Sequence, residues 1–425
     1  MKPMSKLKKA LPFILVISCF ALWGFANDIT NPMVKAFSKI FRMSVTQGAL
    51  VQLAFYGGYF AMALPAALFI RRYSYKTGLL LGIGLYAVGA LLFFPAASIG
   101  EFEPFLLAYF ILTCGLSFME TSANPLMLTM GDPKSAAFNL NLAQSFNPIG
   151  SLCGMFVAMK FIQAKLNPMS SAERMLLDES TFETVKAADL DVLVRPYVLV
   201  GILLTIIFLM IFVTRIQTQE DSVHRSLNLG QSLKKLFANI TYREGVIAQF
   251  FYVGAQITCW TFIIQLGTDI LMAEGYSEQM AEIKSQQLNI IAMVLFCCSR
   301  FISTWLMKYV NPAKMLAAYA LFAAIAIAVV IMNQGRLSLY CLVATSAFMS
   351  LMFPTIYALA LGKVKGDIEI GSAGLIMAIL GGSVLPPVQA LIIDTGNVAL
   401  SFVVPFICFV VVLIYGLRSL RFNKS

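Results

Sequence analysis

The chain has 425 residues, of which 59% are hydrophobic and only 12% are charged, and its formal net charge is +10. A water-soluble protein keeps about a quarter of its residues charged, so this composition excludes an ordinary soluble globular protein. Apolar stretches recur from one end to the other, on the scale of the roughly 20 residues that a membrane-crossing helix needs. The sequence therefore predicts an all-α polytopic membrane protein.

Twelve membrane spans are predicted, with short polar connections between most of them. The first follows a basic N-terminal segment, as in a signal peptide. Its apolar stretch is long and lacks a small-residue cleavage site, however, so we expect it to be retained. In chain order the spans are predicted at residues 10–37, 45–70, 77–98, 103–130, 137–163, 193–215, 244–272, 281–306, 312–332, 337–361, 369–393 and 399–417.

Lys and Arg are distributed unevenly between the two sides that these spans define. If both termini lie inside, the inner segments carry about twice as many Lys and Arg as the outer segments. This bias follows the positive-inside rule, so we place both termini in the cytoplasm. The positive net charge is then a consequence of topology and does not indicate a nucleic-acid partner.

A long polar segment divides the chain into two halves of six spans each. We expect an N-terminal half at 1–215, a central cytoplasmic loop at 216–243 and a C-terminal half at 244–425. A weak internal repeat relates residues 117–128 to 347–359, as in transporters built from paired six-helix halves. The outer segment 164–192 is expected to be a solvated connection.

Catalytic and metal chemistry find little support in the sequence. All eight cysteines fall in apolar spans, where they act as small hydrophobic residues, and the single histidine, His224, lies in the central loop. No cysteine spacing resembles a zinc site or a disulfide framework. We therefore expect no metal, no cofactor and no enzymatic reaction.

Glu120 is a carboxylate inside a predicted span, where a charge costs a few kcal/mol. It opens the run Glu-Thr-Ser-Ala-Asn-Pro at 120–125, in which Pro125 frees a backbone carbonyl and lets the helix bend. Hydrogen bonds to these neighbours could hold the acid neutral. We favour the other interpretation, that Glu120 faces a water-filled cavity and exchanges a proton.

Asp28 is a second carboxylate within a predicted span. It shares one helix face with Asn27 and Asn31, because residues three and four positions apart are neighbours on a helix. So many polar residues are unsuited to a helix that faces lipid, and they predict a sugar-sized polar cavity. The alternative for Asp28 is an acid solvated at the mouth of such a cavity.

Amide and aromatic side chains in other spans complete the predicted substrate site. An amide both donates and accepts hydrogen bonds, which suits a neutral ligand rich in hydroxyl groups. Trp260 could cover the apolar face of a sugar ring, and packing is an equally good interpretation of it. Outside the first span, the predicted substrate-binding residues are Asn124, Gln144, Asn147, Gln256, Trp260, Gln287 and Tyr357.

Arg300 and two glycine pairs receive other roles. Arg300 lies within a span, where we expect its long side chain to reach the cytoplasmic surface; the alternative is an ion pair or a part in gating. The pairs Gly57–Gly58 and Gly381–Gly382 are expected to permit close approach of helices.

At these residues the sequence resembles the fucose:proton symporter family of the major facilitator superfamily. The matching stretches follow one another over nearly the whole chain and include WGFAND (23–28), METSANP (119–125), FNLNLAQSFNPIG (138–150), QFFYVGAQITCW (249–260), SAFMSLMFPTIYAL (346–359) and GSAGLIMAILGG (371–382). The resemblance implies twelve helices, import of a sugar with a proton by alternating access, and a monomer.

The resemblance also implies roles for single residues. Glu120 matches the acid of the family motif E-T-[SA]-A-N-P, which implies that it binds the coupling proton, while Gln144 and Asn147 match amides that contact sugar. The first helix departs from the family pattern N-x-x-[NT]-D, whose acid falls at Asn31. We infer that Asp28, one turn earlier, takes over that role.

We therefore predict a proton-coupled importer of L-fucose. Met352 and Phe353 replace positions that are more polar in fucose-carrying relatives, so another hexose such as glucose or galactose remains the alternative, with sodium coupling or no coupling also open. A drug exporter would have a broader and more apolar site. A membrane enzyme would need a catalytic constellation that the sequence lacks, and a non-transporting sugar receptor stays open.

Overall fold

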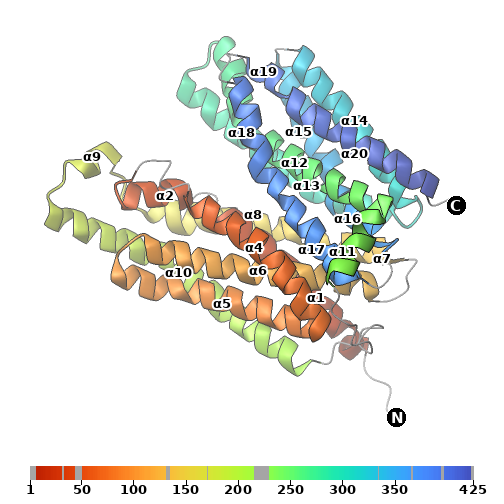
Figure 1. Cartoon of the computed structure of the whole chain (residues 1–425). Helices are drawn as coiled ribbons and strands as arrows, with labels where there is room; N and C mark the ends of the chain where they lie inside the picture. The colour runs from red at the N-terminus through yellow and green to blue at the C-terminus, as the bar shows by residue number, and fades with distance from the viewer. Residues whose placement is uncertain are drawn as a thin grey trace. The chain divides into compact units, whose positions relative to one another are not determined.

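The computed structural model of the chain is helical in all its regular elements within the part that it describes (Figure 1). Twelve helical segments in this part are long and apolar enough to cross a membrane, which confirms the predicted architecture. The predicted site residue Asn31 and His224 lie outside the described residues. The structure describes residues 6–30, 33–43, 50–130, 135–169, 171–214, 229–333, 335–364, 367–393 and 397–422.

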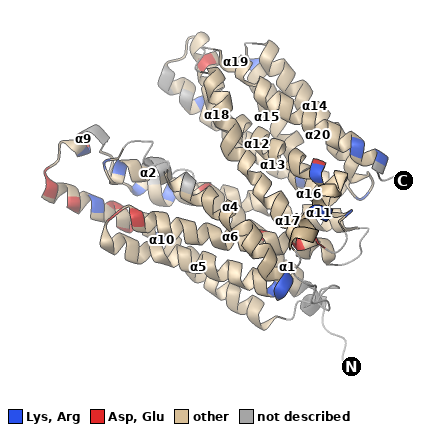
Figure 2. Ribbon diagram, in the orientation of Figure 1, with Lys and Arg blue, Asp and Glu red and all other residues tan. Residues whose placement is uncertain are grey.

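The chain forms two compact units, and each is considered by itself. Unit 1 comprises Met1–Leu126 and Phe146–Leu227, and unit 2 comprises Met127–Ser145 and Asn228–Ser425. The segment 127–145 thus groups with unit 2, although it lies among the first six spans. In both units the helices are uncharged over most of their length (Figure 2).

The helices of unit 1 are packed through small residues. They are α1 (Lys6–Thr30), α2 (Met33–Ile40), α4 (Leu50–Arg72), α5 (Tyr75–Ile99), α6 (Glu103–Thr129, within the unit up to Leu126), α8 (Asn147–Val157), α9 (Ser171–Met175) and α10 (Glu179–Val213). α1 lies along α8 so closely that a Cβ on Gly150 would come within 1.7 Å of the Ala21 carbonyl oxygen. Backbones that approach this closely are typical of helix contacts inside membranes.

In unit 2 the long helix α12 contacts most of the other helices. The helices of this unit are α7 (Ala136–Gln144), α11 (Leu229–Ala238), α12 (Ile240–Ala273), α13 (Glu278–Leu306), α14 (Pro312–Met332), α15 (Arg336–Met349), α16 (Met352–Leu361), α17 (Ile368–Met377), α18 (Gly381–Ile393), α19 (Val398–Ser401) and α20 (Val403–Phe422). Three predicted spans of this unit are therefore each divided, into α15 with α16, α17 with α18, and α19 with α20.

The two glycine pairs behave differently from one another. A Cβ on Gly58 would come within 2.1 Å of the Thr113 hydroxyl oxygen, and one on Gly381 within 2.0 Å of the Phe250 carbonyl oxygen. A Cβ on Gly382 would be 3.0 Å from the Ile257 side chain. These three glycines allow close packing as expected. No atom of the described residues lies within 4 Å of such a Cβ on Gly57, so the expectation for it was wrong.

The outer segment 164–192 is a folded element rather than a solvated connection, which corrects the prediction. Arg174 and Asp189 form an ion pair of 2.5 Å, with side chains only 0% and 3% exposed. Asp189 also accepts a hydrogen bond from the Asn167 backbone N–H at 2.7 Å. Helix α10 consequently begins at Glu179, well before the predicted span at 193–215.

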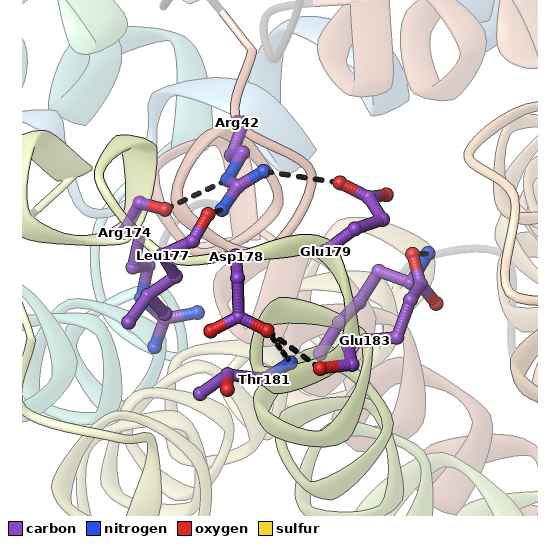
Figure 3. A network of polar contacts seen from close by, with 9 residues as sticks. Arg42, Arg174, Leu177, Asp178, Glu179, Thr181 and Glu183 are labelled. Carbon is purple, nitrogen blue, oxygen red and sulfur yellow. Dashed lines mark hydrogen bonds and ion pairs between the residues drawn. The ribbon is translucent and has the colours of Figure 1, made fainter.

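Asp178 is the N-cap of α10. Its carboxylate accepts hydrogen bonds from the Ser180 hydroxyl at 2.5 Å and the Thr181 backbone N–H at 3.0 Å, which lower its pKa to about 2 (Figure 3). The charged form therefore persists well below neutral pH. A charged N-cap at this position stabilises the early start of the helix.

Arg42 joins the chain after α2 to the start of α10 (Figure 3). It has a left-handed backbone with φ of 53°, and its guanidinium donates to the Arg174 carbonyl at 2.8 Å and the Leu177 carbonyl at 2.9 Å. The same group lies 3.6 Å from a Glu179 carboxylate oxygen and 3.6 Å from the centre of the Phe182 ring. One side chain thus fixes two elements that are far apart in the sequence.

Substitution of the two adjacent glycines of α4 should have opposite effects. Gly58→Ala should lower the free energy of unfolding by about 1–3 kcal/mol, because Thr113 must move. Gly57→Ala should leave it unchanged or raise it by up to about 1 kcal/mol, because alanine favours a helix. Thermal unfolding of the purified variants in detergent tests this, and equal effects would contradict the packing described.

Asp189 and Asp191 of α10, each paired with an arginine, allow a second comparison. Asp189→Asn should lower the free energy of unfolding by about 3 kcal/mol, because it leaves Arg174 charged and buried without its counter-charge. Asp191→Asn is the control, since the pair of Asp191 with Arg195 is exposed and should contribute less than about 1 kcal/mol. A solvated connection would give two equally small effects in the same unfolding measurement.

Candidate functional site

Glu120 is the centre of the polar site in unit 1. Helix α6 carries it among buried small and polar residues, and its side chain is 2% exposed. Within the described residues, neither carboxyl oxygen makes a hydrogen bond of ordinary geometry, although Asn124 lies beside the carboxyl one turn further along α6. A buried carboxyl with so few partners is an unusual environment for a fixed charge.

Two aromatic residues that the sequence analysis did not identify accompany Glu120. Tyr59 of α4 lies near enough for its hydroxyl to interact with the carboxyl, and Trp23 of α1 contacts the same hydroxyl. Both side chains are buried. Tyr59 thus links α1, through Trp23, to the carboxyl on α6. Trp23 belongs to WGFAND, but a tryptophan in an apolar span gives no sign of such a contact.

The polar face of α1 is present in the structure as far as it is described. Asn27 and Asp28 are both half-buried, and the Asp28 carboxylate interacts with Tyr56 of α4. Thr30 is different, because its hydroxyl donates to the Ala26 carbonyl at 2.7 Å within the same helix. The amide and the acid are therefore the members of this face that are suited to contact a ligand.

Asn147 has a structural contact. Its side-chain amide donates to the Phe20 carbonyl of α1 at 3.3 Å, and Ser151 donates to the Gly24 carbonyl at 3.3 Å. Both bonds join α8 to α1, where the small residues already permit close packing. The half-buried amide of Asn147 is thus partly occupied by the fold.

In unit 2, Gln256 and Trp260 lie one turn apart on α12 and are both half-buried. The indole N–H of Trp260 donates to the Ser346 hydroxyl at 3.1 Å, and its ring packs edge-on against Phe296 with centroids 5.0 Å apart. These contacts fix the plane of the indole. A fixed, half-exposed aromatic ring is compatible with both stacking on a ligand and packing.

Tyr357 and Gln287 lie in two different environments. Tyr357 is fully buried in α16, and its hydroxyl forms a hydrogen bond with Ser372 of α17. Met352 and Phe353 are buried on the same helix. Gln287 is exposed on α13 and lines a pocket with Lys284 and Arg336, which none of the other predicted site residues line.

Arg300 does not reach an aqueous surface, and this corrects the expectation for it. Its side chain is 3% exposed, and no ion pair with a carboxylate is present among the described residues. Instead the guanidinium donates to the Gln144 carbonyl at 2.9 Å and the Ser350 carbonyl at 2.5 Å. These carbonyls lie at the ends of α7 and α15, where a helix leaves its last carbonyls unpaired and favours a positive charge.

Further bonds surround Arg300 in unit 2. Gln144 is buried, and the hydroxyls of Ser145 and Thr304 form a hydrogen bond of 3.2 Å. Asn141 of α7 lies 3.4 Å from the Thr355 hydroxyl. The backbone of Gln144 thus helps to hold the helices of unit 2 together, because its carbonyl accepts a hydrogen bond from Arg300. Within the described residues, no group of three or more His, Cys, Asp or Glu side chains is arranged to hold a metal ion.

Comparison with known proteins relates the whole chain to membrane transporters. The sequence profile of the Major Facilitator Superfamily matches residues 16–373. The L-fucose-proton symporter of Haemophilus influenzae is 46% identical over 430 residues, which cover 98% of this chain and 98% of that protein. The glucose/galactose transporter of Brucella abortus is 32% identical, over 94% of this chain and 91% of that protein.

A solved structure shows the same fold. The crystal structure of the Escherichia coli fucose:proton symporter FucP superimposes with a TM-score of 0.87, at 32% sequence identity. The match covers 96% of this chain and 98% of that chain.

Removal of the buried guanidinium should destabilise unit 2. Arg300→Met should lower the free energy of unfolding by about 2 kcal/mol or more, because the carbonyls of Gln144 and Ser350 lose their donors. Arg418→Met is the control, since Arg418 forms a half-exposed pair with Glu244. Chemical denaturation in detergent measures both variants. An unchanged Arg300→Met protein would show that the carbonyls do not need the guanidinium.

Proposed function

The chain belongs to the Major Facilitator Superfamily and, within it, to the family of the L-fucose-proton symporters, and on this premise we propose that it carries L-fucose together with a proton across the membrane. It is a multi-pass membrane transporter and not an enzyme. The relative from Haemophilus influenzae supports the substrate, since its identity of 46% extends over nearly the full length of both chains.

The family of the chain and the distribution of its Lys and Arg residues support a proposal for its membrane and its orientation. We propose the inner membrane of a bacterium, with both termini in the cytoplasm and the transporter working as a monomer by alternating access. The excess of Lys and Arg in the inner segments supports this orientation. Two six-helix halves, as predicted from the sequence, would provide the moving parts.

The buried carboxyl of Glu120 carries the proposal of proton coupling. Among the described residues neither carboxyl oxygen makes a hydrogen bond of ordinary geometry, so the charged form is poorly stabilised and the neutral form suits this buried environment. A neutral acid can release its proton when water reaches it. Glu120 would therefore take up the proton on one side of the membrane and release it on the other. Asp28 of α1 is the second acid of the proposed proton site and would assist Glu120 in proton coupling.

The sugar would bind amide groups and one aromatic ring. Asn27, Asp28 and Gln256 are half-buried, and Trp260 is held in a fixed plane by Ser346. The fold supports some other members of the proposed set less strongly. The side chains of Asn147 and Tyr357 are already hydrogen-bonded, and Gln287 lines a different pocket. The proposed set also keeps Asn31, Asn124, Gln144, Asn147, Gln287 and Tyr357.

A different hexose is the second candidate for the substrate. The glucose/galactose transporter of Brucella abortus is 32% identical, and Met352 and Phe353 form a buried apolar pair on α16. Sodium could replace the proton, because a carboxylate near amides serves either ion. Uptake competition between L-fucose, glucose and galactose separates the sugars, and dependence on sodium separates the ions.

Loss of the carboxyl should uncouple the sugar from the proton. In proteoliposomes, an inward gradient of one pH unit can sustain roughly tenfold accumulation of radiolabelled L-fucose if one proton accompanies each sugar. Glu120→Gln should reduce accumulation to equilibration with the outside. Exchange of labelled for unlabelled sugar should continue, because exchange needs no net proton movement.

Glu103→Gln is the matched control, since Glu103 is exposed in the first turn of the same helix and should not alter accumulation. Uphill uptake retained by Glu120→Gln would exclude this residue as the proton site. Absence of L-fucose uptake by the unaltered protein, with uptake of another hexose, would replace the proposed substrate and keep the mechanism.

A further inference from the structure

An open pocket of about 250 Å³ lies in unit 2 between the adjoining ends of α12, α13 and α15. Its polar side chains are Tyr276, Lys284, Gln287 and Arg336, and its apolar wall includes Ile291. Because a water molecule takes about 30 Å³ of liquid, the volume corresponds to roughly eight waters. The pocket is therefore large enough for a polar group well beyond a single ion.

The charge of the pocket is positive. Among the described residues that line it there are two cations and no carboxylate. Glu274 contacts Arg336 from beside the pocket at 2.8 Å, and the Lys284 ammonium lies 4.1 Å from the centre of the Tyr276 ring. Glu274 interacts with Lys284 as well, so among the described residues the two cations share one carboxylate and one positive charge remains unbalanced.

Two pKa values agree with this charge distribution. The pKa of Tyr276 lies below its usual value, because Lys284 and then Arg336 stabilise the phenolate. The pKa of Glu274 is also lowered, chiefly by its hydrogen bonds to Arg336, so this carboxylate is charged at neutral pH. A local field that favours a phenolate also favours a bound anion.

The rim of the pocket is apolar and exposed. Ile291 and Tyr340 at its edge are more than half exposed, and the exposed side of α13 continues with Ile283, Ile290 and Val294. In helices that cross a membrane, a stripe of exposed isoleucine and valine faces hydrocarbon rather than water. The cations lie toward the helix ends, since Arg336 begins α15 and Lys284 lies in the second turn of α13.

From this combination we propose that the pocket binds an anionic phospholipid. The phosphate would lie between Lys284 and Arg336, and an acyl chain would lie along Ile291 and Tyr340. The unbalanced positive charge selects a lipid of net negative charge over a zwitterionic one. This is a site apart from the proposed proton site, which is in unit 1.

The experiment measures lipid binding to the purified full chain in detergent. Native mass spectrometry quantifies the bound fraction while phosphatidylglycerol, or phosphatidylcholine with the same acyl chains, is titrated. Phosphatidylglycerol should bind more tightly. Lys284→Gln should weaken its binding about fivefold, which corresponds to one lysine charge near an anionic headgroup. Lys284→Arg should retain the binding and shows that the position tolerates change.

Lys314→Gln is the control, because Lys314 is an exposed lysine of α14 that does not line the pocket. It should bind phosphatidylglycerol as the unaltered protein does. Equal binding of the two lipids, or unaltered binding by Lys284→Gln, would overturn the proposal. Inorganic phosphate is added in a further titration: if it displaces phosphatidylglycerol at equal concentration, the site takes a free anion and the lipid assignment is wrong.

Discussion

The hydrocarbon interior of a membrane offers a protein no hydrogen-bond partner, and this constraint decides where polar side chains can lie. It explains why Arg300 is bound to the carbonyls that the ends of α7 and α15 leave unpaired. Asn147 donates to a carbonyl of α1, and Trp260 to Ser346, for the same reason. Some of the polar residues that the sequence predicts for a substrate site, such as Asn147 and Trp260, therefore form hydrogen bonds that hold the fold together.

Glu120 differs from these residues because the described structure uses neither of its oxygens in a hydrogen bond of ordinary geometry. A purely structural acid would be expected to have such bonds, since an unpaired buried polar group costs free energy. The fold instead places Tyr59 and Asn124 near the carboxyl, and Trp23 beside the Tyr59 hydroxyl. This is the observation behind our proposal that Glu120 takes up and releases the coupling proton.

The sequence was sufficient for the features that depend on hydropathy and helix geometry. The twelve spans and their approximate limits follow from apolar stretches, and the carboxyl of Glu120 is conspicuous there by its charge alone. The folded segment around Arg174 and Asp189 was missed, because charged residues in a loop predict solvent unless their pairing is known. The electrostatic interaction of Tyr59 with Glu120 was missed because it involves two helices distant in the sequence.

Helix α1 offers a physical route by which sugar and proton could be coupled. It carries Asn27 and Asp28, which are proposed to contact the sugar, and one turn earlier Trp23, which reaches the Tyr59 hydroxyl beside Glu120. A shift of α1 on sugar binding would change the surroundings of the acid, and protonation of the acid would alter the preferred position of α1. Such mutual dependence is what coupling requires, because each ligand must change the affinity for the other by the same factor.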